Sequence, residues 1–274
     1  MDTKEIVIRP KSSWNFIDFA ELWRFRELFY VFAWRDIKVR YKQTLLGILW
    51  VVFQPLVSTF IFTVFFGNLA KISSGKLPYA LFVLAGLVFW NFFSSALSHA
   101  ATSMVGSANI FQKVYFPKMI LPLSAILTSF VDFLINLAML LLAAIVLGYY
   151  PSLSALIIFP MAVVVTAITA AGLGLLLTSI NIKYRDVGYI LPYFIQLLLF
   201  LTPVIYPITI LSQSHRFIMA LNPMTSVIEA SRTVFSGATY DPVYMVVSFI
   251  SALVILSVGI LYFNKTEQFF ADIV

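Results

Sequence analysis

The chain of 274 residues contains no cysteine and only two histidines, and 11% of its side chains are charged. Without cysteine it has no structural disulfide and no thiol nucleophile, and His99 and His215 alone cannot complete a zinc site of the Cys/His type. Soluble domains carry about 25% charged residues, so the composition excludes an ordinary soluble enzyme. Hydrophobic residues instead make up 61% of the chain, and the mean hydropathy is +0.96.

Five stretches free of Asp, Glu, Lys and Arg each exceed the roughly 20 residues that cross a bilayer core as a helix. One of them, residues 133–182, contains turn residues from Gly148 to Ser152, which a single helix does not readily cross. The sequence therefore predicts an all-α integral membrane protein with six transmembrane helices. The expected spans are residues 46–68, 79–101, 120–148, 154–180, 190–211 and 243–263.

The basic residues predict the orientation of these spans. Fourteen of the 18 Lys and Arg residues lie in the N-terminal segment, the loops at 102–118 and 181–189, and the tail. The positive-inside rule places these regions, and both termini, in the cytoplasm. A five-span arrangement with an external C-terminus stays open, because the tail carries little charge. We expect a cytoplasmic segment over residues 1–45 and a transmembrane domain over residues 46–274.

The N-terminal segment contains the pattern of an interface helix. At 100° per residue, its aromatic and aliphatic residues fall within an arc of about 60°, with charged residues beside it. The arc consists of Phe19, Trp23, Tyr30, Trp34, Ile37 and Tyr41. Such a helix lies in the plane of the lipid headgroups. The alternative is a helix packed on the other cytoplasmic loops.

The region after the fifth span has a different pattern. Pro203 and Pro207 interrupt the apolar stretch, and Asn222-Pro223 is an N-cap and first-turn pair that begins a new helix. We expect two short re-entrant helices within residues 203–236, with their backbone shielded by protein or a water-filled cavity. An ordinary external loop is the alternative.

Asp132 is the only formal charge inside a predicted span. A carboxylate in a membrane helix costs about 2.5–3.5 kcal/mol on insertion scales, which the apolar neighbours offset, and it should face protein or water. No Lys, Arg or Glu lies in another predicted span. We therefore favour a packing or hydrogen-bonding role over a proton relay.

Aromatic residues make up 16% of the chain. For any one of them the default role is to anchor or fill a lipid-facing surface. Aromatic faces also attract the C–H faces of sugars without fixing the hydroxyl groups, so together they suit a path along which a glycan slides. The candidates for such a lining are Phe60, Phe89, Trp90, Phe93, Tyr193 and Tyr206.

The sequence contains no phosphate-binding P-loop. The sole Gly-Lys pair, Gly75-Lys76, is followed by Leu77 and has Ala70 at the position of the required first glycine. We therefore expect no cofactor in this chain, and energy from a partner or a gradient.

Several stretches resemble the permease subunits of ABC-type polysaccharide exporters, the type-2 ABC exporter class that moves O-antigen, capsular and teichoic-acid polymers. These stretches are residues 34–42, 113–117, 121–124, 184–187, 201–207 and 221–224. The resemblance implies a homodimer of six-span subunits in the bacterial cytoplasmic membrane, with a lipid-linked polysaccharide as cargo. It also implies two copies of a separate ATPase subunit that bind ATP and Mg.

The resemblance further implies roles for two groups of residues. The cytoplasmic contacts with the ATPase would include Arg35, Asp36, Lys38, Lys113, Lys118, Arg185 and Asp186. The external gate would include Pro203, Pro207, Asn222, Pro223, Glu229 and Arg232. The alternatives are an ABC permease for a drug or another lipid, and a gradient-driven carrier or scramblase. An integral membrane glycosyltransferase is disfavoured, because the chain has neither an acidic metal cluster nor a soluble catalytic domain.

Overall fold

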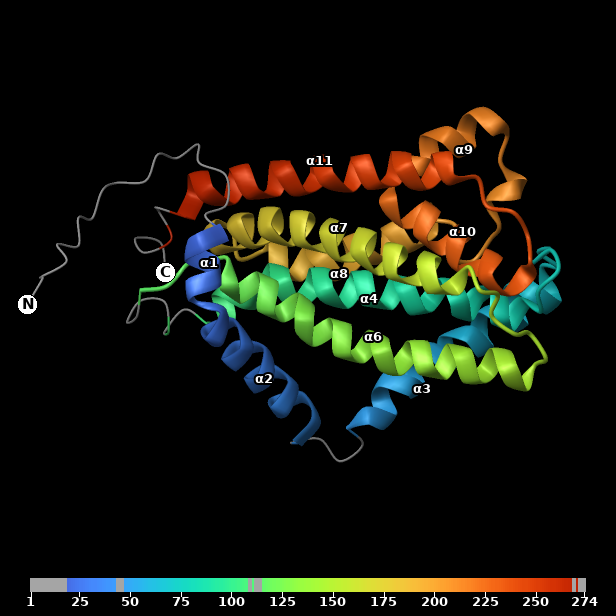
Figure 1. The fold of residues 1–274 in the computed structure, drawn as a ribbon, viewed down its shortest axis with the longest axis horizontal. Helices are drawn as coiled ribbons and strands as arrows, with labels where there is room; N and C mark the ends of the chain where they lie inside the picture. Colours follow the sequence, from blue (N-terminus) through green and yellow to red (C-terminus); the bar gives the residue numbers. More distant parts are fainter. Residues whose placement is uncertain (1–18, 43–46, 108–109, 111–114, 268–269, 271–274) are drawn as a thin grey trace, which may run out of the picture.

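The computed structural model describes residues 19–42, 47–107, 110, 115–267 and 270, and this part of the chain is helical without strands (Figure 1). The helices are α1 (Phe19–Arg24), α2 (Arg26–Lys42), α3 (Ile48–Phe62), the π-helix η1 (Thr63–Leu69), α4 (Tyr79–Gly106), α6 (Ile120–Val146), α7 (Ala155–Lys183), α8 (Val187–Leu201), the short η2 (Ile208–Ile210), α9 (Gln213–Ala220), α10 (Pro223–Ser236) and α11 (Pro242–Glu267).

Five helical segments in the described residues are long and apolar enough to cross a membrane: Ile48–Leu69, α4, α6, α7 and α11. They match the first four predicted spans and the sixth. The predicted fifth span, 190–211, differs, because α8 has only 15 residues. That is about 22 Å at 1.5 Å per residue, short of the roughly 30 Å of a hydrocarbon core. Thr202 is extended because it precedes Pro203, which disfavours a helical conformation.

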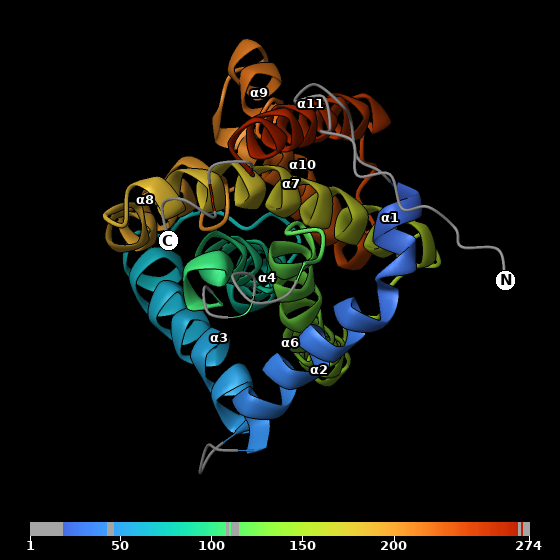
Figure 2. The same cartoon turned by 90° about the vertical axis from the view of Figure 1, so that its left-hand side faces the viewer.

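Helix α4 forms the centre of the bundle, with α3, α6, α7 and α10 around it (Figure 2). Of its most apolar stretch, 78% is buried, whereas the corresponding stretch of the first segment is 11% buried. Helix α11 packs on α7 through two glycines. A Cβ atom added to Gly259 would lie 2.1 Å from the carbonyl oxygen of Gly172, so these two helices meet backbone to backbone.

The beginning and end of the described chain meet at one end of the bundle (Figure 1). The hydroxyl of Tyr115 donates to Glu21 Oε1 of α1 at 3.2 Å. Three residues later, Lys118 Nζ donates to the carbonyl of Glu267, at the end of α11, at 3.0 Å. The residues just before α6 therefore tie α1 and the end of α11 together.

Candidate functional site

The segment that follows α8 leaves the helix and returns to the bundle as α10. Helix α10 is buried along most of its length and packs on α4, α7 and α11, whereas His215, Phe217 and Ile218 of α9 are exposed. Between α8 and η2, residues 202–205 are buried without helical structure. Carbonyl groups of such a segment need partners from the protein, because lipid supplies none.

Arg232 of α10 supplies several of these partners. The residue is 3% exposed, and its guanidinium donates from Nη1 to the carbonyl of Pro203 at 2.9 Å and from Nη2 to that of Val204 at 2.6 Å. Its Nε donates to the carbonyl of Phe82 in α4 at 3.1 Å. The fork of an arginine suits this task, since it presents five donors in a fixed plane. One side chain thus joins α10, α4 and the irregular segment.

Glu229 neutralises this buried arginine. Its Oε1 accepts a hydrogen bond from Arg232 Nη1 at 2.9 Å, and the same oxygen accepts one from the backbone N–H of Ile208 at 3.2 Å. A buried charge is tolerated when it is paired and hydrogen-bonded on all sides. The pair predicted on one helix face is therefore brought together, and it fixes both ends of residues 203–208.

Asn222 and Pro223 begin α10 as the sequence predicts. The Asn222 side chain accepts from Met224 N at 3.1 Å as an N-cap, and its Nδ2 donates to Thr202 Oγ1 at 2.8 Å. Pro203, Pro207 and Pro223 are all buried. On the other side of the segment, the hydroxyl of Tyr79 donates to the carbonyl of Ile205 at 2.7 Å. Tyr79 and Thr202 were not predicted, because their partners lie far away in the sequence. The carbonyl that Tyr79 binds is 126 positions away, and the Asn222 side chain that binds Thr202 is 20 positions away.

A second polar cluster joins α2 to α6. Asp132 of α6 forms an ion pair with Arg40 and accepts a hydrogen bond from the hydroxyl of Tyr41. Arg40 Nη2 lies 2.8 Å from His99 Nε2, and His99 Nδ1 lies 3.0 Å from Ser129 Oγ. Burial and the Asp132 carboxylate raise the pKa of Tyr41, so its hydroxyl stays protonated and donates. Asp132 thus makes hydrogen bonds, as the favoured interpretation expects.

Gly47 and Trp50, at the beginning of α3, line the same hollow as Asp132. Asp132 lies about half-way along α6, and its charge is balanced by the ion pair with Arg40. Arg40 was missed as its partner because it belongs to the segment before the first predicted span.

Helices α1 and α2 have one face that packs on the protein and one face that is exposed. The inward face packs on the loop before α6, where the rings of Phe32 and Phe116 are 5.6 Å apart. The outward face carries Trp23, Tyr30 and Trp34 of the predicted arc, which are 71%, 62% and 51% exposed. One face thus packs on the loop before α6, as the alternative expects, and three aromatic residues of the predicted arc are exposed on the other face.

The candidate ATPase contacts differ in their exposure and in their contacts with the rest of the chain. Arg35 and Asp36 form an exposed ion pair at 2.8 Å, and Lys38 is exposed. Arg185 and Asp186 are exposed in the turn between α7 and α8. Lys118 is engaged within the chain, with Glu267 and with the ring of Phe270 at 5.4 Å. Lys113 lies outside the described residues.

Asn181 holds the turn between α7 and α8 in place and was not predicted. Its Nδ2 donates to the carbonyl of Ala101 in α4 at 2.9 Å, and its Oδ1 accepts from Gly188 N at 3.1 Å. The side chain is buried. Any displacement of the 184–186 turn is therefore transmitted to the beginning of α8 and to α4.

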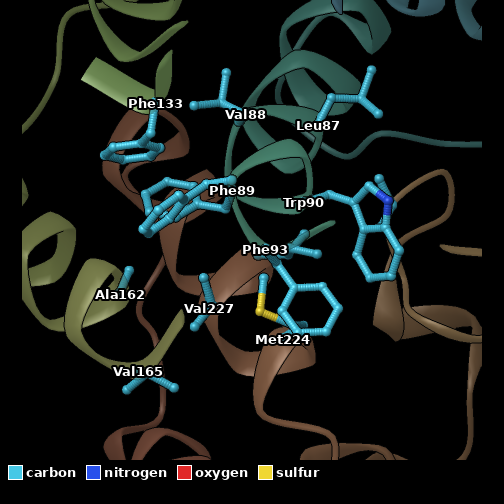
Figure 3. Packing of buried hydrophobic residues seen from close by; sticks show 14 of the residues in the cluster. Leu87, Val88, Phe89, Trp90, Phe93, Phe133, Ala162, Val165, Met224 and Val227 are labelled. Carbon is cyan, nitrogen blue, oxygen red and sulfur yellow. The ribbon is translucent and has the colours of Figure 1, made fainter. Parts of the chain in front are cut away.

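The predicted channel-lining aromatics fall into two groups. Phe60 of α3 and Tyr193 of α8 are 69% and 72% exposed. Phe89, Trp90 and Phe93 are buried in the centre of the subunit (Figure 3). Phe89, for example, packs on Phe133 and Phe159 with ring centroids 5.2 and 5.9 Å away. These three residues of α4 act as core packing in this structure and face no open surface of the subunit.

Helices α3 and α8 lie on the same outer side of the bundle (Figure 2). Most of their large apolar residues are exposed, and each helix also exposes one amide, Gln54 in α3 and Gln196 in α8. Tyr206, just beyond α8, is half-buried and donates to the carbonyls of Phe200 and Leu201 at 3.3 Å. Because polar side chains are costly in lipid, the two glutamines indicate that these faces meet protein or water.

Comparisons with known proteins point to one kind of relative. Residues 27–236 match the protein family described as ABC-2 type transporter. The O-antigen export system permease protein RfbA of Klebsiella pneumoniae is 28% identical over 248 residues, which cover 90% of this chain and 95% of that protein. RfbA of Myxococcus xanthus is 28% identical over 254 residues, covering 91% and 96%. Polysialic acid transport protein KpsM of Escherichia coli is 22% identical over 239 residues, covering 85% and 91%.

Proposed function

Because the chain belongs to the ABC-2 type transporter family, we propose that it is the membrane subunit of an ATP-driven exporter that moves a lipid-linked polysaccharide across the bacterial cytoplasmic membrane. The chain is a multi-pass membrane transport subunit and not an enzyme. The observation that carries the proposal is the match to polysaccharide export proteins along about nine-tenths of the chain. The cargo is thus of the O-antigen or capsule kind.

Two copies of the subunit form the channel in this proposal. The exposed faces of α3 and α8, with Phe60 and Tyr193 among their aromatics, support a path between the copies. Gln196 gives this path a hydroxyl-binding group without many others beside it, which lets a glycan slide. The fifth of six crossings consists of α8 extended by residues 202–207, whose backbone is shielded by protein. Helices α9 and α10 form a re-entrant hairpin on the outer side.

The energy comes from two copies of an ATPase subunit, which bind ATP and Mg. They dock at the end of the bundle that holds α1, the start of α6 and the turn at 184–186, and this end and both termini are cytoplasmic. The hydrogen bonds of Asn181 transmit a displacement of that turn to α8. The ion pair of Arg40 with Asp132 transmits a displacement of α2 to α6. At the outer end, the Arg232 network holds the hairpin closed until α4 and α8 move.

The proposal is tested by purification with membrane partners. The chain is expressed with an affinity tag beside its neighbouring genes, extracted in mild detergent and analysed for a co-purifying ATPase. We expect an ATPase whose turnover rises when lipid-linked glycan from the producing cells is added, and does not rise with a hydrophobic drug. A chain that purifies without any ATPase, or an ATPase stimulated only by drugs, would contradict the assignment.

A further inference from the structure

A hollow of about 280 Å³ opens between the end of α2, the start of α3, α4 and α6. It is separate from the outward face of α8 and from the hairpin of α10. Ligand sites for small molecules start at about 300 Å³, so the hollow has room for a single ring and not for an oligosaccharide. Its walls combine aromatic residues, amides and the Arg40 and Asp132 pair.

Three amide side chains converge on this hollow without a partner of their own. Asn136 is 6% exposed and its Oδ1 accepts no hydrogen bond from the described residues. Neither Gln54 nor Asn91, which also line the hollow, has a side-chain hydrogen bond within the described part of the chain. A buried polar atom left unpaired costs about 1–3 kcal/mol. These groups are therefore prepared for a ligand that donates and accepts in several directions.

The charges of the hollow disfavour an anion. Among the described residues, Arg40 is the only cationic one that lines it; its charge is paired with Asp132, and its Nη2 lies against His99. Apart from this pair, the lining is uncharged. A phosphate would have to displace the carboxylate, whereas a neutral polyol binds amides and hydroxyls without such competition.

The aromatic part of the wall fits the same kind of ligand. Trp50 at the beginning of α3 is 54% exposed and lines the hollow together with Phe92. An indole face attracts the C–H face of a pyranose, while the amides opposite it bind the hydroxyl groups. A flexible acyl chain would use the aromatic wall but leave Asn91 and Asn136 unpaired.

The position of the hollow selects which sugar could reach it. It lies where α3 begins, beside the exposed apolar residues Leu49 and Phe53 of that helix. A lipid anchor that lies along this apolar face holds the sugar attached directly to it at the hollow. We propose that the hollow binds the sugar ring next to the lipid anchor of the glycan, and so registers the cargo before it enters the channel. This inference rests on the proposed function.

The natural absence of cysteine allows a direct test. Ser95→Cys places one thiol in the lining of the hollow, and Thr102→Cys places one on an exposed position two turns further along α4, as the matched control. Each variant is assembled with its ATPase partner in nanodiscs and labelled with a small charged methanethiosulfonate. The probes are lipid-linked glycan extracted from the producing cells and polyprenyl diphosphate without sugar.

We expect the lipid-linked glycan to slow labelling of Ser95→Cys at least fivefold and to leave Thr102→Cys unchanged, while the sugar-free lipid protects neither. Asn91→Ala should raise the concentration of glycan lipid needed for half-maximal protection about three- to tenfold, the effect of one lost hydrogen bond. Equal protection by both lipids would overturn the sugar assignment in favour of a diphosphate site.

The same preparation separates the two proposals. If the glycan lipid stimulates the ATPase but Ser95→Cys labels at an unchanged rate, the hollow is not a sugar site and the exporter function stands. If the glycan lipid neither stimulates the ATPase nor protects any position, both are overturned.

Discussion

Arg232 of α10 donates a 3.1 Å hydrogen bond from Nε to the carbonyl of Phe82 in α4, and its guanidinium lies 3.5 Å from the centre of the Phe82 ring. The two residues are 150 positions apart in the sequence. A buried cation that both hydrogen-bonds a helix backbone and stacks on an aromatic ring is held in one orientation. The hairpin is thereby locked to the central helix of the bundle.

The first prediction concerns this lock. Arg232→Met should lower the free energy of unfolding by about 3–5 kcal/mol, because it leaves Glu229 and buried carbonyls unpaired. The free energy of unfolding of Arg232→Lys should lie between those of the unchanged protein and Arg232→Met, since a lysine ammonium cannot reproduce the planar set of donors of the guanidinium. The readout is the thermal unfolding midpoint in detergent, with Arg216→Met in α9 as the control. An Arg232→Met variant as stable as this control would show that the network is dispensable.

The second prediction compares two ion pairs near α2. A double-mutant cycle with Arg40→Met and Asp132→Asn should give a coupling energy of about 1–3 kcal/mol, because the pair is partly buried and shares partners. The same cycle with Arg35→Met and Asp36→Asn should give below about 1 kcal/mol, as is usual for exposed pairs. Equal coupling in the two cycles would argue against a special role for Asp132.

The third prediction tests the contact of α7 with α11. Gly259→Ala should destabilise the subunit by about 1–3 kcal/mol or more, since the added methyl group would overlap the backbone of Gly172. Gly106→Ala, at the end of α4, meets no atom within 4 Å and should be neutral or slightly stabilising. Folded yield and unfolding midpoints of the two variants decide the matter.

The fourth prediction separates channel residues from core residues. Tyr193→Ala should slow glycan export while the amount of folded protein stays constant, because the ring is exposed on α8. Phe89→Ala should instead remove folded protein, with a cost of about 3–5 kcal/mol for a fully buried ring. Export per folded complex is the measurement, and parallel losses for both variants would place Tyr193 among the structural residues.

The fifth prediction concerns docking of the ATPase. Reversal of the charges of Arg185 and Asp186 in one variant should uncouple ATP hydrolysis from export without removing the protein from the membrane. Lys76→Glu, exposed at the other end of the bundle, is the control. Unchanged export in the double reversal would remove this turn from the coupling surface.

The positions of the long spans could be predicted because a helix that crosses a bilayer needs about 20 consecutive apolar residues. The end of α8 could not be predicted in the same way. Residues 201–207 are as apolar as the helix before them, and only the prolines indicate that the helix ends. The partner of Asp132 was also hidden. It depends on how α2 packs against α6 in space, which the linear sequence does not contain.

The local structure of the residues proposed for the gate was easier to predict than the surroundings of the aromatic residues proposed for the channel. Asn222 and Pro223 carry a local capping signal, and Glu229 and Arg232 are one turn apart, so their pairing follows from helix geometry. Phe89 and Phe60 have similar apolar surroundings in sequence, yet one is buried and the other exposed. The difference arises from which helix occupies the centre of the bundle, and hydrophobicity alone does not distinguish a core face from a face toward a second copy.

The central claim is that this subunit moves a lipid-linked polysaccharide only when a partner hydrolyses ATP. It is tested most directly by reconstituting the complex in proteoliposomes and measuring transfer of the lipid-linked glycan to the opposite leaflet. The partner is either active or inactivated in its ATP-hydrolysing residue. We predict transfer that requires ATP and is lost with the inactive partner. Transfer at the same rate with the inactive partner would contradict the account and identify a gradient-driven carrier or a scramblase.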